Sequence, residues 1–410
     1  MPVIKKQEIL IPAKSIDMTK WAVVACDQFT SEKEYWEELE KYVADSPSTL
    51  ELTFPEIYLR ENNEPRIEKI NQRMREYLSK DYFQNLGECM VLVNRSTCEH
   101  ERRLGIMLNV DLEDYDFTPL APAMIRATEG TIIERIPPRV AIRKDAPIEF
   151  PHIMLLYDDR EELIAENLFK NKDKLQKIYD FDLNMDGGHI AGYKIENADE
   201  IIAKFNKLIS DEYIKKTFNT NQKMMFAVGD GNHSLATAKE HWNRTKVGLT
   251  EEERENHPAR YVLVEAVNIH DSGIQFEPIY RVIKNAPDEF VTRLKSLKID
   301  GEKREELLIS STCEEKFYLP KFSPLAIKVV QDLIDEYVKK GMMEVDYVHG
   351  LDSLRTICKA KNMLGITLPT IDKSELFEFV LKYGVLPRKS FSIGEAREKR
   401  YYLEGHIIRK

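Results

Sequence analysis

The chain has 410 residues, with 60 Lys and Arg against 70 Asp and Glu, and a formal net charge of −10. At about 150 residues per domain its length predicts two or three domains, and its 42% of hydrophobic residues excludes a globally disordered chain. An acidic surface repels phosphate backbones, so we do not expect nucleic acid as the main partner, and any anionic ligand needs a local group of cations.

Signals for targeting, membranes and metals are few. No apolar run approaches the roughly 20 residues that cross a bilayer, and the N-terminal sequence MPVIKKQEILIPAK lacks the apolar stretch of a signal peptide. The five cysteines form no C-x-x-C pair, which is typical of reduced thiols. We therefore expect a cytoplasmic protein with no membrane partner, and the scattered histidines predict no structural zinc.

Hydrophobic periodicity and turn residues predict the elements along the chain. In chain order they are a strand over 21–26, a helix begun by a capping box of Ser31 and Glu34, a helix over 67–77, a hairpin of strands 89–93 and 104–110, a strand over 152–157, helices over 161–175 and 200–214, a strand over 224–228, a helix over 233–244, a strand over 261–267, a helix over 325–339 and a strand over 343–348.

Strands and helices mix without strict alternation, which predicts an α+β fold of mixed sheets with packed helices. The least periodic stretch, 301–324, is expected to contain the domain boundary. It would separate a motif-bearing α+β domain, residues 1–300, from a smaller α/β segment, residues 325–410, that packs on it and helps to complete the site.

The most informative motif follows the strand at 224–228, where Gly229, Asp230, Gly231 and Asn232 form a turn that leads into a helix. The glycines permit positive φ and the close approach of a ligand, and a helix N-terminus attracts anions. Asp230 could hold Mg²⁺ or accept the proton of a hydroxyl. The pattern is neither a dinucleotide fingerprint nor a Walker loop, because a third glycine and a G-K-[ST] sequence are missing.

Two residues at the start of the helix extend this motif. His233 could donate to a phosphate oxygen or act as an acid or base, which makes it a catalytic candidate beside Asp230. Ser234 is a candidate ligand-binding residue. The alternative is purely structural, because Asp-Gly and Gly-Asn are common turn dipeptides and Asn232 or Ser234 could cap the helix.

A second motif carries the local positive charge that the acidic composition requires. Residues 126–144 hold five basic and two acidic side chains. The planar guanidinium groups of Arg126 and Arg139 suit a phosphate or a carboxylate, and Glu129 is a further candidate for ligand binding. The alternative is a solvated strand face on which the arginines pair with Glu129 and Glu134.

Two further positions are candidates for ligand contacts. His189 lies in the glycine-rich stretch 182–192, which is either a mobile loop or a hairpin connection. Lys389 follows Leu-Pro-Arg and is either a ligand-binding cation or an ordinary surface lysine.

These motifs resemble those of a bacterial and archaeal family known as domain of unknown function one thousand and fifteen. The segments that carry the resemblance are FAVGDGNHSLATAK from Phe226, RATEG from Arg126, NMDGGH from Asn184 and LPRKS from Leu386. The resemblance covers nearly the whole chain. It implies membership of that family and no particular reaction, because the family has no established activity.

Many members of that family carry Asp-Gly-His-His-Arg where this chain has Asp-Gly-Asn-His-Ser at 230–234. The commoner form is similar to a motif of the chromosome-partitioning-protein and sulfiredoxin superfamily, which includes kinases of free serine. This resemblance implies a sulfiredoxin-like core in which Asp230, Gly231 and His233 form a phosphate-binding turn.

Ser234 stands where those relatives have an arginine, so a phosphate-binding cation must come from elsewhere in the chain. The candidates are Arg126, Arg139 and Lys389. The leading hypothesis is a nucleotide- or phosphate-binding enzyme, a phosphotransferase that acts on a small hydroxyl metabolite with ATP or ADP and Mg²⁺. The alternative is a non-catalytic ligand-sensing or regulatory module that uses the same turn.

Overall fold

The computed structural model describes residues 2–59, 63–359 and 363–409. The chain divides into two compact units, of which the first comprises Met1–Ala127, Thr131–Ile274 and Gly394–Lys410, and the second Thr128–Gly130 and Gln275–Ile393. The stretch 301–324, where we expected the boundary, lies inside the second unit, because its strands β16 (Lys303–Ile309) and β17 (Glu314–Pro320) pair with each other along their whole length.

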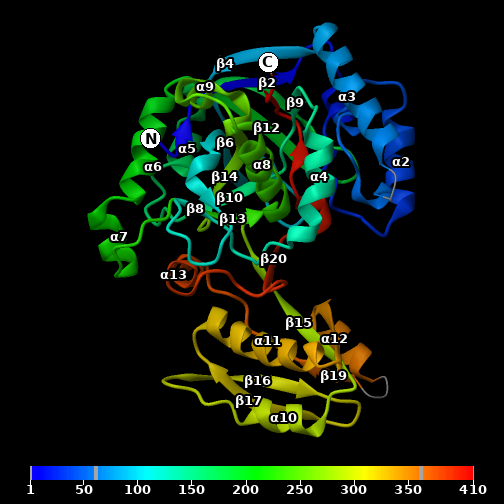
Figure 1. Ribbon diagram of the computed structural model, residues 1–410, viewed down its shortest axis with the longest axis vertical. Helices are drawn as coiled ribbons and strands as arrows, with labels where there is room; N and C mark the ends of the chain where they lie inside the picture. Colours follow the sequence, from blue (N-terminus) through cyan, green and yellow to red (C-terminus); the bar gives the residue numbers. More distant parts are fainter. Residues whose placement is uncertain (1, 60–62, 360–362, 410) are drawn as a thin grey trace. The chain divides into compact units, whose positions relative to one another are not determined.

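A mixed sheet of ten strands in the described residues forms the first unit (Figure 1). Its order is β11-β12-β5-β6-β14-β10-β13-β8-β7, and β1 pairs with β6. The strands are β1 (Ile4–Lys5), β5 (Met90–Ser96), β6 (Arg103–Asp111), β7 (Tyr115–Asp116), β8 (Ile125–Arg126), β10 (Met154–Tyr157), β11 (Gln176–Asp182), β12 (His189–Ile195), β13 (Phe226–Asp230) and β14 (Tyr261–Asn268). The pairs β10/β14, β13/β8 and β7/β8 are parallel and the other pairs are antiparallel, so the prediction of mixed sheets with packed helices is confirmed.

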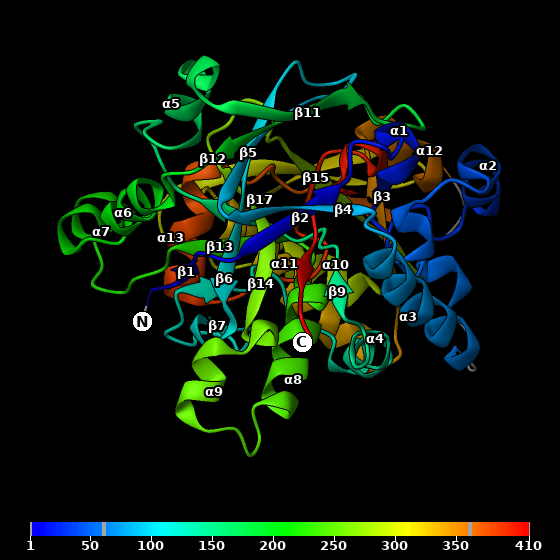
Figure 2. The same ribbon diagram turned by 90° about the horizontal axis from the view of Figure 1, so that it is seen from above.

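The central strands have nearly continuous apolar sequences because both faces of the sheet are covered. On β5, Leu92 packs into one core, and Val91 and Val93 pack into the other. Helices α6 (Ala198–Leu208) and α8 (Asn232–Thr245) contribute to the first core. Helices α2 (Lys33–Val43) and α3 (Glu64–Ser79), which lie side by side in Figure 1 and Figure 2, contribute to the second.

The remaining elements of the first unit are short. Three two-stranded pairs, β2 with β4, β3 with β21 and β9 with β22, connect distant parts of the sequence. The strands are β2 (Glu8–Pro12), β3 (Val23–Val24), β4 (Phe83–Glu88), β9 (Ile148–Glu149), β21 (Tyr401–Tyr402) and β22 (His406–Ile407). The helices are α1 (Met18–Trp21), α4 (Ile136–Arg143), α5 (Ala165–Lys170), α7 (Asp211–Phe218) and α9 (Glu251–Asn256), with 3-10 turns η1 (Thr49–Glu51), η2 (Glu56–Tyr58), η3 (Leu112–Asp114), η4 (Ile133–Arg135), η5 (Lys172–Lys174), η6 (Pro258–Arg260) and η7 (Ala396–Glu398).

The second unit has its own sheet, in the order β17-β16-β19-β15-β18, and β20 pairs with β15. Val282, Ile309, Leu354 and Cys358 form part of its core. Its other elements are β15 (Phe276–Lys284), β18 (Glu344–His349), β19 (Met363–Ile366), β20 (Phe391–Ile393), α10 (Asp288–Lys295), α11 (Ser323–Lys339), α12 (Leu351–Cys358) and α13 (Lys373–Tyr383).

Three predicted helices differ from the structure in their ends. Helix α2 begins after Glu32 without a side-chain cap, so the predicted capping box is wrong. The helix predicted over 161–175 is reduced to α5: Glu162 has a φ of 55°, which excludes it from a right-handed helix, and the 3-10 turn η5 follows Asn171. The helix predicted over 200–214 is two helices, because Ser210 caps α7 with an extended backbone. Among the described helices, none is both long and apolar enough for a membrane span.

Candidate functional site

The Gly-Asp-Gly-Asn motif joins strand β13 to helix α8 in the first unit. Gly231 has a φ of 82° and is the N-cap of α8, which has no side-chain cap. A Cβ on Gly231 would lie 3.1 Å from the Cα of Ile153, so this position favours glycine for two reasons. The N-cap position of α8 makes no side-chain cap hydrogen bond, so neither Asn232 nor Ser234 acts as the N-cap of this helix.

Asp230 forms an ion pair with Lys399, a residue that we did not single out from the sequence. The Nζ of Lys399 lies 3.2 Å from Oδ2 of Asp230, and the side chains are 14% and 25% exposed, so solvent screens the pair only in part. The other carboxylate oxygen accepts a hydrogen bond from the backbone N–H of Gly231 at 2.9 Å. Ser234 stands where many family members have an arginine, and a lysine from the far end of the sequence places a cation at this turn.

The backbone around Lys399 is fixed by a buried arginine. Arg95, on β5, donates to the carbonyl oxygens of Arg397, Glu398 and Lys399, which are the residues of and just after η7. The guanidinium of Arg103 also donates to the carbonyl of Glu398. The central sheet therefore holds the segment that carries Lys399.

His152 is the second centre of the site. Its Nδ1 lies 3.0 Å from the hydroxyl of Tyr402, and its Nε2 lies 3.3 Å from Oγ of Ser234 and 3.6 Å from Oδ2 of Asp27. Burial alone would lower the pKa of His152, but the negative charge of Asp27, its hydrogen bond and the charge of Asp230 raise it above 6.5. Burial would raise the pKa of Asp27, but the charge of His152 and its hydrogen bond outweigh the effect of burial and lower this pKa.

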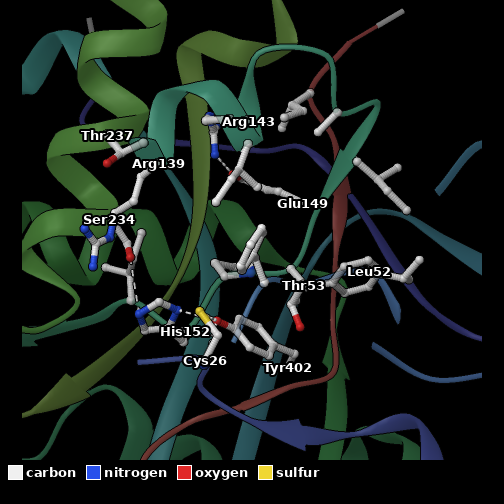
Figure 3. A pocket seen from close by; sticks show the side chains of 18 of the residues that line it. Cys26, Leu52, Thr53, Arg139, Arg143, Glu149, His152, Ser234, Thr237 and Tyr402 are labelled. Carbon is white, nitrogen blue, oxygen red and sulfur yellow. Dashed lines mark hydrogen bonds and ion pairs between the residues drawn. The ribbon is translucent and has the colours of Figure 1, made fainter. Parts of the chain in front are cut away.

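A cavity of about 160 Å³ lies next to these groups (Figure 3). His152, Ser234 and Tyr402 line it together with Cys26. Burial, and then the charge of Asp27, raise the pKa of Cys26 to about 12. The thiol therefore stays protonated at neutral pH and is a poor nucleophile.

Of the predicted arginines, neither Arg126 nor Arg139 pairs with Asp230. Arg126 is buried, and its guanidinium donates to the carbonyls of Ala123 and Lys223 and to the side chain of Gln222. Arg139 lies on α4, lines the cavity and forms an ion pair with Glu56. The positive charge counted over 126–144 is therefore not one cluster, because each described guanidinium has its own partners.

The remaining predicted residues lie as follows. Nε2 of His233 accepts the backbone N–H of Ile132 at 3.3 Å, so this nitrogen carries no proton. His189 begins β12 of a hairpin, as one reading of 182–192 predicted, and its ring nitrogens lie 2.7 Å from Asp180 and 2.7 Å from Asp182. Glu129 and Lys389 belong to the second unit.

Sequence patterns contain little signal for the residues that complete the site. Asp27, Lys399 and Tyr402 stand in charged or aromatic stretches without glycine or any motif spacing. His152 follows Pro151 at the end of the arginine-rich segment and could have been noticed as a lone histidine beside a strand. Pairing of β3 with β21 brings the two ends of the sequence together at this site.

The carboxylates Asp27 and Asp230 are the groups here that suit Mg²⁺. Each already has a basic side chain beside it, His152 for Asp27 and Lys399 for Asp230. Within the part of the chain that the structure describes, no cluster of three or more His, Cys, Asp and Glu has a geometry that would hold a metal. Because Mg²⁺ commonly takes one or two carboxylates together with phosphate oxygens of a substrate, these residues fit an ion that arrives with a phosphate ligand.

Comparison with solved structures finds distant likenesses. A conserved hypothetical protein from Pyrococcus furiosus is 14% identical, with 72% of this chain and 90% of that chain covered and a TM-score of 0.33. A free serine kinase in complex with AMP is 13% identical, with 74% and 92% covered and a TM-score of 0.38. SbnI with a C-terminal truncation, from Staphylococcus aureus, is 9% identical, with 74% and 87% covered and a TM-score of 0.38.

Likenesses at these identities and TM-scores do not carry a function from one protein to another. A search among curated proteins found no match. A family model, in contrast, matches residues 10–343, which is most of the chain. This match agrees with the family that the sequence motifs indicate. The chain belongs to the family described as protein of unknown function (DUF1015).

Proposed function

We propose that the first unit binds the phosphate groups of ATP or ADP at the N-terminus of α8 and transfers a phosphoryl group to the hydroxyl of a small molecule. The observation that carries the proposal is the glycine N-cap of α8, which lets a ligand approach the backbone closely, with Lys399 paired to the adjacent Asp230. Backbone amides and a positive helix end bind anions. A lysine ammonium adds the positive charge that phosphate binding requires.

Phosphate binding would rearrange the ion pair at the turn. Lys399 would turn part of its hydrogen bonding from Asp230 to a phosphate oxygen, and the positive φ of Gly231 keeps the backbone close to the ligand. The side-chain oxygen of Asn232 is buried without a hydrogen-bond partner, and as an acceptor it suits a ligand hydroxyl or a metal ion. Ser234 offers a hydroxyl within reach of His152. A bound Mg²⁺ would supply charge neutralisation on the phosphate oxygens, and Asp230 or Asp27 would hold it.

The chemical step would take place between the turn and His152. The acceptor oxygen forms a bond to the terminal phosphorus while the bond from that phosphorus to the bridging oxygen breaks, and the nucleotide leaves with one phosphate fewer. The acceptor proton passes to the carboxylate of Asp230, since His152 lowers the pKa of Asp27 and makes that carboxylate a weak base. Asp27 and Asp230 raise the pKa of His152, which favours the protonated imidazole, and in that form His152 would offset negative charge on the transferred group.

Binding and turnover must be tested separately. Isothermal titration calorimetry with ATP, ADP and AMP measures binding, and ³¹P NMR with a panel of alcohols and polyols detects a phosphate monoester. We expect Asp230→Asn to abolish turnover while the melting temperature stays nearly unchanged. The matched control is Asp186→Asn, which removes an exposed ion-paired carboxylate on a loop and should leave turnover intact.

Three outcomes would contradict the proposal in different ways. Nucleotide binding without product over several hours would favour the sensing module. A large loss of stability in Asp230→Asn without a change in ligand binding would make the turn structural. Absence of binding to all three nucleotides would remove the phosphate site. The cytoplasmic location and the sulfiredoxin-like core remain predictions that accompany this proposal.

A further inference from the structure

The cavity beside His152 has two chemically different parts. One end is formed by His152, Ser234, Tyr402 and Cys26, and the other end holds Arg143 and Glu149 (Figure 3). His152 and Ser234 line the cavity and also lie at the turn that carries Asp230. One end of a molecule bound in the cavity would therefore lie next to Oγ of Ser234 and Nε2 of His152. The cavity is therefore placed to hold the partner of the phosphate ligand.

Most of the cavity wall is hydrocarbon. Its apolar residues come from the segments that follow α2, from α3, from α4 and from the stretch leading to β10. Among them are Leu52, Phe54, Met74, Ile142, Ala146 and Ile148. A sugar or polyol in this space would leave several hydroxyl groups without partners, at a cost of about 1–3 kcal/mol for each.

The charged residues of the wall are already paired. Arg139 forms an ion pair with Glu56, and Arg143 forms one with Glu149. Glu149 also lies 2.6 Å from Nε2 of His406, which is buried. Each pair is neutral as a whole, so an additional ligand charge would be buried without a counter-charge.

A ligand with a carboxylate is the alternative to an uncharged ligand, because Nε and Nη2 of Arg143 are buried and have no hydrogen-bond partner. A carboxylate on that edge would gain about 1.5–3 kcal/mol from charged hydrogen bonds. It would also place a second negative charge beside Glu149, and the desolvation of a buried ion costs several kcal/mol. The balance favours an uncharged ligand.

Size sets a further limit. A cavity of about 150 Å³ holds a molecule as large as benzene, and this one has about 160 Å³. We propose that the cavity is the acceptor subsite and takes an uncharged alcohol with a mainly hydrocarbon body of roughly six to eight non-hydrogen atoms. This names the acceptor class and rests on the proposed function for its role as a phosphoryl acceptor.

The test measures binding to the full-length protein without nucleotide. The probes are 1-hexanol, hexanoate and glycerol. Saturation-transfer NMR detects their binding, and calorimetry measures the affinity. We expect 1-hexanol to bind, and hexanoate and glycerol to bind about tenfold more weakly or not at all. Tighter binding of hexanoate would show that the unpaired edge of Arg143 determines the ligand, and tighter binding of glycerol would show a polar subsite. Either result, or no binding of 1-hexanol, overturns the proposal.

Two variants locate the binding site. Ala146→Leu adds hydrocarbon inside the cavity and should weaken 1-hexanol binding about tenfold or more. Leu59→Trp fills the cavity from a half-buried position and serves if Ala146→Leu does not fold. The matched control is Ala203→Leu on the exposed side of α6, which should bind like the wild type. Unchanged 1-hexanol affinity in a folded cavity variant would overturn the assignment.

The nucleotide experiments keep this inference separate from the proposed function. If 1-hexanol binds in the cavity and no nucleotide binds, the cavity is a ligand site and the phosphotransferase proposal fails. If nucleotides bind and 1-hexanol does not, the phosphate site stands and the acceptor class proposed here is wrong.

Discussion

His406 should make the folded protein sensitive to mild acid. The residue is 2% exposed. Burial, and then the positive charge of Arg143, lower the pKa of His406 from 6.5 to about 3, although its Nε2 lies against Glu149. The folded protein therefore keeps this imidazole neutral at a pH where the unfolded chain has already protonated it.

The sign follows from the two protonation states. Between pH 6.5 and about 3 the unfolded chain binds a proton that the folded chain does not, so the stability contributed by the neutral imidazole is present above this window and is lost as the pH falls through it. From pH 7 to pH 5 the loss attributable to His406 is about 2 kcal/mol. This figure hardly changes as long as the folded pKa stays below about 4.

Urea unfolding at pH 7 and pH 5 measures this contribution. His406→Gln keeps a donor for Glu149 and removes the titration, so the variant should lose about 2 kcal/mol less than the wild type over this interval. His349→Gln, at an exposed position of the second unit, is the control and should behave like the wild type. Equal losses in wild type and His406→Gln would refute the reasoning.

Three further predictions concern the turn and its supports. Lys399→Met should weaken ADP binding by about tenfold or more, because one charged hydrogen bond to phosphate is lost; calorimetry measures it, and unaltered affinity would count against the phosphate site. Arg95→Lys should lower the free energy of unfolding in urea by about 3 kcal/mol, because buried carbonyl groups lose their donors. It should also weaken ADP binding, and normal binding would show that Arg95 does not position Lys399. Gly231→Ala should cost more stability than Gly248→Ala. Both glycines have positive φ, of 82° and 86°, but only at Gly231 would the new Cβ meet Ile153. Equal losses of melting temperature would mean that the contact relaxes.

Local sequence patterns predicted the elements better than the site. The hairpin of β5 and β6 and the helix α8 were predictable because their apolar spacing and turn residues are contained within short segments. Glu162 shows the limit of such reasoning, because its positive φ keeps the start of the segment 161–175 out of the helix that the apolar pattern predicts there.

The turn at Asp230 was found from its glycines, which are constrained by local backbone geometry. Its partners were not found, because the ion pair with Lys399 depends on pairing of β21 with β3 and on the contacts of Arg95. Arg126 was misjudged for the related reason that charge counted along a sequence does not show where each guanidinium points.

The return of Gly394–Lys410 to the first unit has a consequence for synthesis of the protein. Lys399 and Tyr402 are made only after the second unit's residues 275–393, which take roughly 6–24 s at ribosomal rates of about 5–20 residues per second. During that interval the turn at Asp230 already exists in the nascent chain without its lysine, and His152 lacks its tyrosine. A chain released early could still fold much of the large sheet, but it would carry an incomplete site, so a ligand of the completed site would distinguish finished molecules from truncated ones.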